Sequence, residues 1–351
     1  MRTFAATVLG QLVRHVRQLQ EGPGVRFKDS IRQSPGEATG ENAILANHSS
    51  ESSTSKFPPE FEAAHYQAIH PDLSHMQPEE LAQHWIHQGI KEGRQGGRIA
   101  DRNQFADLIP ANASVLEIGP FNRPMKTGPN VRYFDVLDRN GLIERAQKIG
   151  YETSGIPSKI DYVSAEADLS VVQETFDFVL SSHAVEHQPD LVRHLMEVER
   201  LLNPGGCYFL IIPDKRFCFD HFMPETPLSL VVEAYVNNHT RHPLHSVFEH
   251  RMLATHNDPL LHWQGNHGER YASLKIRYDI AMEEFRSARG GYIDVHAWYF
   301  TPESFRETTI ALAALFPVSL VPIRIYPTRY GVLEFFAILR KMPLSPTATD
   351  S

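Results

Sequence analysis

The chain has 351 residues, 42% of them hydrophobic, so it is long enough to bury a sizeable core in one large domain or two smaller ones. Its net charge is −8 and its Lys and Arg residues form no long run, so nothing in the charge balance indicates a nucleic-acid partner. The two cysteines, Cys207 and Cys218, argue against a disulfide framework and a multi-cysteine metal site, and they are consistent with a cytoplasmic protein.

The first 56 residues combine a periodic segment with a polar one. In residues 1–20, apolar side chains from Phe4 to Val16 recur at helical spacing, which predicts an amphipathic helix that docks on the protein or on a partner. A membrane-surface anchor or a transit-like segment is the alternative. Residues 21–56 are rich in Gly, Ser, Glu and Asn, so we expect a flexible linker.

Residues 57–98 have the pattern of a small helical module. Apolar residues between Tyr66 and Ile90 are spaced for two or three short helices, and Pro78 is well placed to begin one of them. The pattern Y…HPDL…H…G…EGR resembles a small helical module found beside glycan-processing domains in bacterial proteins. We expect its histidines to cap helices or fill a small core rather than to bind metal.

Residues 99–345 alternate short apolar runs with helical stretches, which predicts an α/β fold with a mostly parallel sheet. The expected strands, in chain order, are VLEIG (115–119), VRYFDV (131–136), IDYVSA (160–165), FDFVLSS (176–182) and CYFLIIP (207–213). Residues 189–202 form a helical pattern that NPGG (203–206) is expected to end. A second helix, capped by Thr301, precedes an antiparallel hairpin at 318–327 and 332–341.

Acidic residues follow the predicted strands at their carboxyl ends, where ligands bind in an open α/β sheet. Glu117 and Gly119 end the first strand. Asp135 ends the second strand and is placed to accept hydrogen bonds from ribose hydroxyls, with Asp138 as the rival ligand. Asp168, after the third strand, could accept from an adenine amino group or cap a helix.

The loop after Gly119 argues against a dinucleotide cofactor. A pyrophosphate needs several close-approach glycines and a free helix N-terminus, whereas residues 120–124 are Pro-Phe-Asn-Arg-Pro. A nicotinamide-dependent sugar oxidoreductase is therefore disfavoured. A nucleoside cofactor without phosphates makes smaller demands on this loop.

The motifs VLEIGPFNRP, YFDV, ADL, FDFVLSSHAVEHQPD and LLNPGGCYFLIIPD resemble, in this order, those of class I S-adenosylmethionine-dependent methyltransferases, in the branch related to ubiquinone and menaquinone methyltransferases. The match covers residues 114–213 closely, and the later helix and hairpin complete a Rossmann-like seven-stranded sheet. The resemblance implies an enzyme with S-adenosylmethionine as its cofactor. The cofactor-binding residues that it implies are Glu117, Gly119, Pro120, Asp135, Asp168, Leu169, Ser182 and His183.

The chain departs from this family in the first loop. Pro120 and Asn122 replace glycines of the E-x-G-x-G-x-G pattern, and about 11 residues separate Gly119 from the second strand, which is too few for a full crossover helix. A catalytically silent binding or scaffold protein in glycan biosynthesis is therefore the alternative.

Residues 213–300 form a long insert, which we expect to cover the site and recognise the acceptor. Its two ends, PDKRFCFDHFMPETP and YIDVHAWYFTPESF, resemble signatures of a bacterial methyltransferase subgroup associated with surface-polysaccharide gene clusters, which implies a small-molecule or glycan-linked acceptor. Methyl transfer to oxygen or nitrogen benefits from a general base with a pKa near 7, for which histidine is suited. The candidate catalytic residues are His296, His221, His187 and Asp214, with Asp220 and Asp294 as further bases or orienting groups.

Other charged and metal-ligating residues of the insert have two interpretations. Lys215 and Arg216 either bind an acidic sugar or phosphate or pair with neighbouring acids. The density of histidines suggests a metal site, but Pro243 interrupts any shared helical face and no cysteine is nearby. We therefore expect hydrogen-bonded histidines and no metal. The histidines concerned are His239, His242, His245, His250, His256, His262 and His267.

Overall fold

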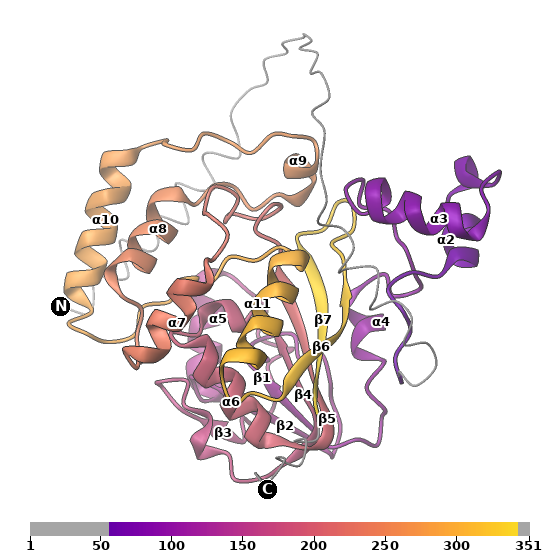
Figure 1. The fold of residues 1–351 in the computed structure, drawn as a ribbon. Helices are drawn as coiled ribbons and strands as arrows, with labels where there is room; N and C mark the ends of the chain where they lie inside the picture. Colours follow the sequence, from indigo (N-terminus) through magenta and orange to yellow (C-terminus); the bar gives the residue numbers. More distant parts are fainter. Residues whose placement is uncertain (1–55, 343–351) are drawn as a thin grey trace, which may run out of the picture. The chain divides into compact units, whose positions relative to one another are not determined.

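The computed structural model describes residues 56–342 of the chain (Figure 1). The predicted helix at 1–20 and nearly all of the predicted linker at 21–56 lie outside these residues. Within them, no helix combines the length and apolar character needed to cross a membrane.

A seven-stranded sheet forms the centre of the fold, with the strand order β3-β2-β1-β4-β5-β7-β6. Its strands are β1 (Val115–Ile118), β2 (Val131–Asp135), β3 (Tyr162–Val163), β4 (Phe176–Ser182), β5 (Leu202–Pro213), β6 (Leu320–Tyr326) and β7 (Glu334–Lys341). The first five strands pair in parallel, and β7 pairs antiparallel with both β5 and β6. The predicted α/β fold with a C-terminal antiparallel hairpin is confirmed.

Two of the predicted element boundaries were wrong. The third strand contains only Tyr162–Val163, which is common for a strand at the edge of a sheet. The fifth strand begins at Leu202 instead of Cys207, so NPGG, which follows the end of α6 at Leu201, lies inside β5. Gly205 adopts a φ of +73°, and the register between β4 and β5 shifts beside Phe176. This irregularity lets the chain pass from helix to strand without a loop.

Helices α6 (Leu191–Leu201) and α11 (Pro302–Leu315) pack on one face of the sheet (Figure 1). The Thr301 side chain accepts a hydrogen bond from the Ser304 backbone N–H, and Pro302 occupies the first turn, so the predicted cap of α11 is confirmed. The apolar stripe of each helix is buried against alternate residues of the strands.

The opposite face of the sheet is covered in part by α4 (Arg102–Ala106). Its Phe105 ring lies 5.0 Å from the ring of Phe209 on β5 and 4.9 Å from that of Phe336 on β7, measured between centroids. The connection from β1 to β2 contains no helix, as the short spacing predicted. After β2 comes α5 (Arg139–Ile149). Asp138 caps its N-terminus and Gly150 caps its C-terminus.

The insert joins β5 to α11 and is largely helical. Its helices are α7 (Leu228–Val236), α8 (Leu244–Leu253), α9 (Pro259–Trp263) and α10 (Leu274–Ser287). Both ends of the insert meet at the end of β5, where Asp214 forms an isolated parallel bridge with Phe300. The insert thus starts and finishes at the carboxyl edge of the parallel strands.

The helical module before the domain contains α2 (Ala63–Ile69) and α3 (Pro78–His84), followed by a π-helical turn at Trp85–Gly89. Pro78 is the first residue of α3, as predicted. The Tyr66 side chain is fully buried, and its hydroxyl lies 3.0 Å from Nδ1 of His84. This histidine fills a small core, in agreement with the prediction for the module.

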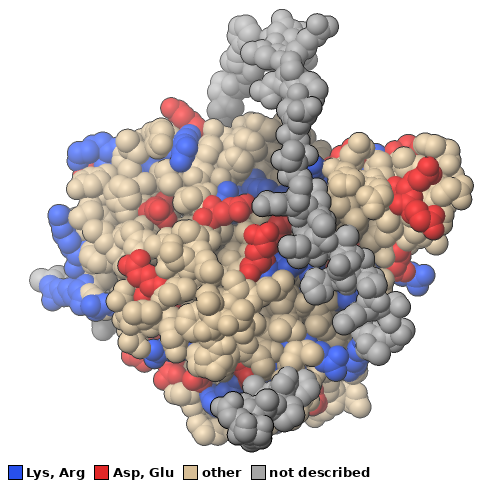
Figure 2. Space-filling model, viewed as in Figure 1, with Lys and Arg blue, Asp and Glu red and all other residues tan. Residues whose placement is uncertain are grey.

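Charged side chains are mixed on the face that Figure 2 shows. Among the described residues on that face, Lys and Arg lie between Asp and Glu rather than in one continuous basic patch. Such a surface produces no extended field of one sign there.

Candidate active site

The order in which successive strands are added to the sheet reverses between β1 and β4. From β1, strands β2 and β3 extend to one side and β4 and β5 to the other. In open α/β sheets the ligand binds at the carboxyl ends of the strands beside this reversal. Gly119, Asp135 and Ser182 lie at or next to those ends.

Gly119 brings two loops close together at this edge. Its φ of +71° is readily adopted only by glycine. A Cβ atom added at Gly119 would meet only the side chain of Ala184 within 4 Å, at 3.8 Å. Pro120 follows as a buried residue, and its carbonyl accepts the N–H of Arg123. The loop after β1 therefore approaches the turn after β4 and leaves space beside Gly119.

Glu117 fixes the loop that replaces the glycine-rich pattern. Its buried carboxylate accepts the backbone N–H groups of Met125 at 2.7 Å and of Lys126 at 3.0 Å. Burial raises the pKa of Glu117 to about 7, although these N–H donors lower it in part. A contact between Glu117 and a cofactor stays a prediction, because the structure uses both carboxylate oxygens within the protein.

Asp135 and Asp138, the two rival ribose ligands, differ in how they are engaged. Asp138 caps α5, and its carboxylate accepts the Gly141 N–H at 2.8 Å. Asp135 is 7% exposed and accepts the Leu137 N–H at the longer distance of 3.3 Å, while burial raises its pKa. Asp135 is thus a buried acid at the end of β2, whereas Asp138 is an exposed helix cap, and the choice between them as the ribose ligand stays a prediction.

Asp168 caps a short 3₁₀ helix, Leu169–Val171, which is the second of its two predicted roles. It accepts hydrogen bonds from the backbone and the hydroxyl of Ser170, both at 2.8 Å, and these bonds lower its pKa. Leu169 is buried, and its carbonyl accepts a hydrogen bond from Arg200. An adenine contact at Asp168 or Leu169 stays a prediction.

At the end of β4, Ser182 is followed by His183 in a left-handed conformation, with a φ of +51°. Nε2 of His183 lies 2.8 Å from Glu334 on β7, and Arg102 binds the same carboxylate. Burial opposes ionisation of Glu334, but His183 and Arg102 outweigh it and lower its pKa to about 2. The His183 imidazole is thus held by β7, and a cofactor contact stays a prediction.

A set of acids and imidazoles around the buried Glu186 lies just beyond this point, and we call it the Glu186 cluster. It consists of Glu186, His187, Asp220, Asp294 and His296. Nε2 of His187 and Nε2 of His296 each lie 3.9 Å from Oε1 of Glu186. The cluster unites two predicted catalytic histidines with both predicted orienting acids.

Each imidazole of the Glu186 cluster has a carboxylate on its outer nitrogen. Nδ1 of His296 lies 2.6 Å from Asp220, and Nδ1 of His187 lies 3.0 Å from Asp294. Burial disfavours the charged form of His187, but Asp294 and Glu186 outweigh this effect and raise its pKa. Arg145 of α5 also pairs with Asp294 at 2.6 Å, which ties the insert to the domain.

For Glu186 the sequence left helix-entry hydrogen bonding and a catalytic role equally open, and it was not among the main candidate catalytic residues. It has no exposed surface, and among residues 56–342 its carboxylate oxygens have no hydrogen-bond partner. The available signal was its place beside His187 in the segment that follows the fourth strand. The insert residues that complete its surroundings are distant in sequence, so spacing could not reveal them.

The structure does not bring His221 and Asp214, the other two candidate catalytic residues, into the Glu186 cluster. Asp214 is fully buried and binds Arg216 and the Thr328 hydroxyl, each at 2.6 Å. Nδ1 of His221 lies 2.8 Å from the Arg216 carbonyl. The prediction that Arg216 pairs with a neighbouring acid is confirmed.

His221 belongs to a second histidine group, with His262 and His267, in which one ring nitrogen of each lies within 4.8 Å of the others. Nδ1 of His262 lies 3.0 Å from Nδ1 of His267, and Nε2 of His262 lies 3.0 Å from the His256 carbonyl. The rings of His221 and His267 stack at 3.6 Å. The expectation of hydrogen-bonded histidines is confirmed for this group.

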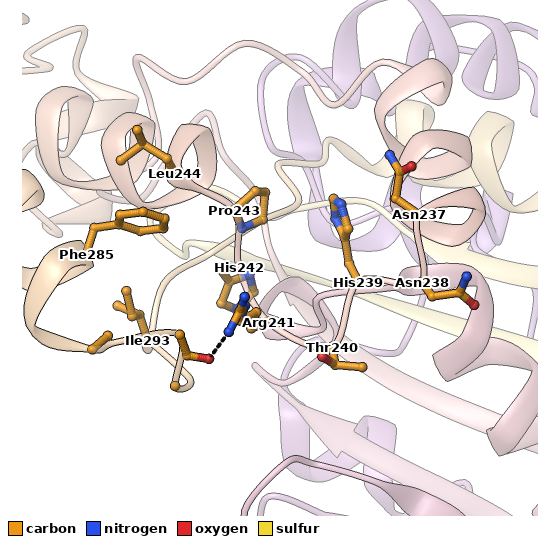
Figure 3. Close-up of a pocket in the computed structure, with 13 residues that line it drawn as sticks. Asn237, Asn238, His239, Thr240, Arg241, His242, Pro243, Leu244, Phe285 and Ile293 are labelled. Atoms are coloured by element: carbon orange, nitrogen blue, oxygen red, sulfur yellow. Dashed lines mark hydrogen bonds between the residues drawn. The ribbon is translucent and has the colours of Figure 1, made fainter.

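A cavity of about 600 Å³ lies in the insert, between the end of α7 and the end of α10 (Figure 3). Leu244, Phe285 and Ile293 form an apolar side, while Asn238 and Thr240 lie on a polar side. His242 also lines the cavity and lies close enough to His187 for their charges to interact. The cavity therefore borders the Glu186 cluster.

A family model described as a methyltransferase domain matches residues 132–210. The chain carries a class I S-adenosylmethionine-dependent methyltransferase domain. The matched segment of this methyltransferase runs from β2 to β5 and includes Asp135, Asp168 and the turn that contains Glu186. The fold and the family match together make the chain an S-adenosylmethionine-dependent methyltransferase, with S-adenosylmethionine as its cofactor.

Several solved methyltransferase structures are similar to the chain at low identity. A SAM-dependent methyltransferase from Thermotoga maritima is 21% identical over 39% of this chain and 59% of that one, with a TM-score of 0.24. One from Mesorhizobium loti is 13% identical over 69% and 98%, with a TM-score of 0.36. The 1,6-didemethyltoxoflavin-N1-methyltransferase of Burkholderia thailandensis is 13% identical over 82% and 93%, with a TM-score of 0.34. No curated protein matches the chain significantly. TM-scores this low support no inference about substrate.

Proposed function

We propose that this methyltransferase moves a methyl group to an oxygen or nitrogen atom of a small-molecule or glycan-linked acceptor. The observation that carries the proposal is the Glu186 cluster beside the carboxyl end of β4, in which Asp220 orients the buried imidazole of His296 and Asp294 lies beside the half-buried imidazole of His187. An imidazole held in this way is suited to remove a proton from a hydroxyl or amine.

Two features of the strand ends support a cofactor site there. The space beside Gly119 admits close approach of a ligand, and the carboxylate of Asp135 has capacity for ribose hydroxyls. We assign Asp135 to the ribose, and Glu117 to holding the loop around the methionine part. Asp168, Leu169, Ser182, His183 and Pro120 complete the proposed cofactor-binding set.

The cofactor supplies a methyl group on a positively charged sulfur, which is an electrophile that needs little activation. The protein therefore has to align the acceptor atom and remove its proton. In the cluster without a bound metal ion, the proton of the acceptor passes to Nε2 of His296. Nδ1 is already occupied, because its N–H group donates to the carboxylate of Asp220. The new O–CH₃ or N–CH₃ bond forms as the S–CH₃ bond breaks, and its electron pair stays on sulfur.

The cavity of Figure 3 is the proposed acceptor entrance. One side offers amide and hydroxyl groups and the other is apolar, a combination that suits a sugar ring with an apolar face or substituent. Because His242 lines the cavity and is near enough to His187 for their charges to interact, an acceptor in the cavity would lie near the Glu186 cluster. The polar and apolar sides of the cavity thus favour a glycan-linked acceptor, without selecting one sugar.

A catalytically silent scaffold is the second candidate. It is favoured by Glu117, whose carboxylate oxygens both serve backbone N–H groups of the altered loop. A scaffold would keep the sheet and the insert but would transfer no methyl group. The Glu186 cluster weighs against it, because a scaffold has no use for a pair of imidazoles held beside carboxylates.

The test is transfer of a labelled methyl group from S-adenosylmethionine to a panel of hydroxylated and amino sugars, glycolipids and small aromatic acceptors. With an accepted substrate, His296→Gln should lower kcat by about 10²-fold or more, while His267→Gln from the second histidine group should leave it near wild type. Equal rates in His296→Gln and wild type would contradict the assigned role. Cofactor binding without transfer to any acceptor would favour the scaffold.

A further inference from the structure

The Glu186 cluster has the composition of a metal centre. We propose that Glu186, His187 and His296 bind one divalent transition-metal ion, for which Zn²⁺ is the best match. Two imidazoles and one carboxylate form a ligand set that such ions take readily, whereas Mg²⁺ and Ca²⁺ prefer oxygen ligands alone.

The three ligand atoms already lie close to the required geometry. They are all within 4.8 Å of one another, and Oε1 of Glu186 is 3.9 Å from each Nε2. In a tetrahedral zinc site with bonds of about 2.0–2.1 Å, neighbouring ligand atoms lie about 3.4 Å apart. Ion binding would therefore need shifts of less than about 1 Å in these side chains.

Carboxylates lie beside the outer nitrogens of both imidazoles, as in known metal centres. Asp220 lies 2.6 Å from Nδ1 of His296, and Asp294 lies 3.0 Å from Nδ1 of His187. A proton on Nδ1 that is shared with a carboxylate leaves the lone pair on Nε2, which points toward Glu186. His296 is therefore held in the tautomer that binds a metal, whereas Nδ1 of His187 lies beside Asp294 without the geometry of a hydrogen bond.

Glu186 supplies the independent observation. Its carboxylate has no exposed surface and, in the described part of the chain, no hydrogen-bond donor. Burying an unsatisfied carboxylate is costly, and a cation between Glu186 and the two imidazoles would remove that cost. The backbone carbonyl of Glu186 accepts the Ala297 N–H at 2.8 Å, so the strand end and the insert are already joined at this place.

The second histidine group is the weaker metal candidate. There His262 uses both ring nitrogens in hydrogen bonds, and His221 and His267 stack face to face. No carboxylate takes part in that group of ligating atoms. The group therefore serves as an internal comparison for the Glu186 cluster.

The function of the ion rests on the proposed methyl transfer, whereas its binding does not. Three protein ligands leave at least one coordination position, which the acceptor oxygen or nitrogen can fill. With the ion in place, both Nε2 atoms are ligands, so the proton of a metal-bound acceptor passes to water instead of to His296. The ion would thus orient the reacting atom and favour its deprotonated form.

The experiment is a calorimetric titration of the EDTA-treated full chain with Zn²⁺, repeated with Co²⁺ and followed by visible absorption. Wild type and His267→Gln should each bind about one ion with equal affinity. Glu186→Gln and His296→Gln should bind at least 10-fold more weakly and lose the Co²⁺ spectrum. Asp294→Asn keeps every ligand and should weaken binding by about 10- to 100-fold.

Circular dichroism identifies any variant that fails to fold, and Asp294, being half exposed, is the variant most apt to keep its fold. Equal Zn²⁺ affinity in wild type, Glu186→Gln and Asp294→Asn would overturn the proposal, as would loss of binding in His267→Gln alone.

S-adenosylhomocysteine is titrated into the same samples. Zn²⁺ binding without S-adenosylhomocysteine binding would refute only the proposed function, and the reverse result would refute only the metal site.

Discussion

The side chain of Glu117 on β1 is buried, and its carboxylate holds the altered loop by accepting the backbone N–H groups of Met125 and Lys126. The sequence predicted that this position matters, because ligands bind at the carboxyl ends of the strands in an open α/β sheet. It could not predict the partner, since the loop replaces the glycines that the family pattern would place there. Because burial raises the pKa of Glu117, the residue should make the stability of the protein depend on pH.

The stability of the protein should depend on pH through Glu117. Its folded-state pKa of about 7 lies above the unfolded value of about 4.3, so its protonated form is favoured by folding. This contribution is fully present below about pH 4.3 and is lost as pH rises through about 7. Relative to Glu117→Gln, ligand-free wild type should lose stability on the order of 2 kcal/mol between pH 5 and pH 8.

Urea unfolding of both proteins at several pH values measures this difference directly, and the other titrating groups cancel in the comparison. A wild-type to variant difference that stays constant with pH, or that grows in favour of wild type, would show that Glu117 is ionised at low pH in the folded protein.

At the scale of elements, local signals predicted most of the fold. Apolar runs gave five parallel strands, and Thr301 with Pro302 marked the start of α11. The errors arose where neighbouring chain segments decide the outcome. NPGG is a strong turn signal, yet it lies inside β5 as an irregular stretch, because Leu202 before it and Cys207 after it both pair with β4.

The helical module offers a test of packing at this scale. A Cβ atom added at Gly96 would lie 2.4 Å from two ring atoms of Trp85, which is too close for the ring to stay in place. Gly96→Ala should therefore lower the free energy of unfolding by about 1–3 kcal/mol, measured by urea titration with circular dichroism. If Gly96→Ala and Trp85→Phe are combined, the loss should be smaller than the sum of the single losses. Strictly additive losses would contradict the close contact.

At the scale of the whole molecule, the site is assembled from segments far apart in the chain. Glu186 and His187 follow β4, Asp220 lies near the start of the insert, and Asp294 and His296 lie near its end. Residue type allowed His187 and His296 to be predicted as candidates. The pairing of each with its acid depends on the path of the insert, which periodicity and local spacing do not determine.

The proposed metal site also depends on the path of the insert. The sequence suggested a metal only through the number of histidines in the insert, and those between His239 and His245 share no helical face around Pro243. In the folded chain, the convergent set instead combines two histidines with Glu186, a residue that the sequence did not connect with a metal. Long-range packing of the insert on the strand end creates it.

The most direct test of the account is a calorimetric titration of the full chain with S-adenosylhomocysteine, beside Asp135→Ala and Asp138→Ala. We predict micromolar binding to one site, weakened at least 10-fold in Asp135→Ala because charged hydrogen bonds to the ribose are lost. Asp138→Ala should keep the affinity and lose about 1 kcal/mol of stability as a helix cap. Absence of binding to the wild-type chain, or equal binding by wild type and Asp135→Ala, would contradict the account.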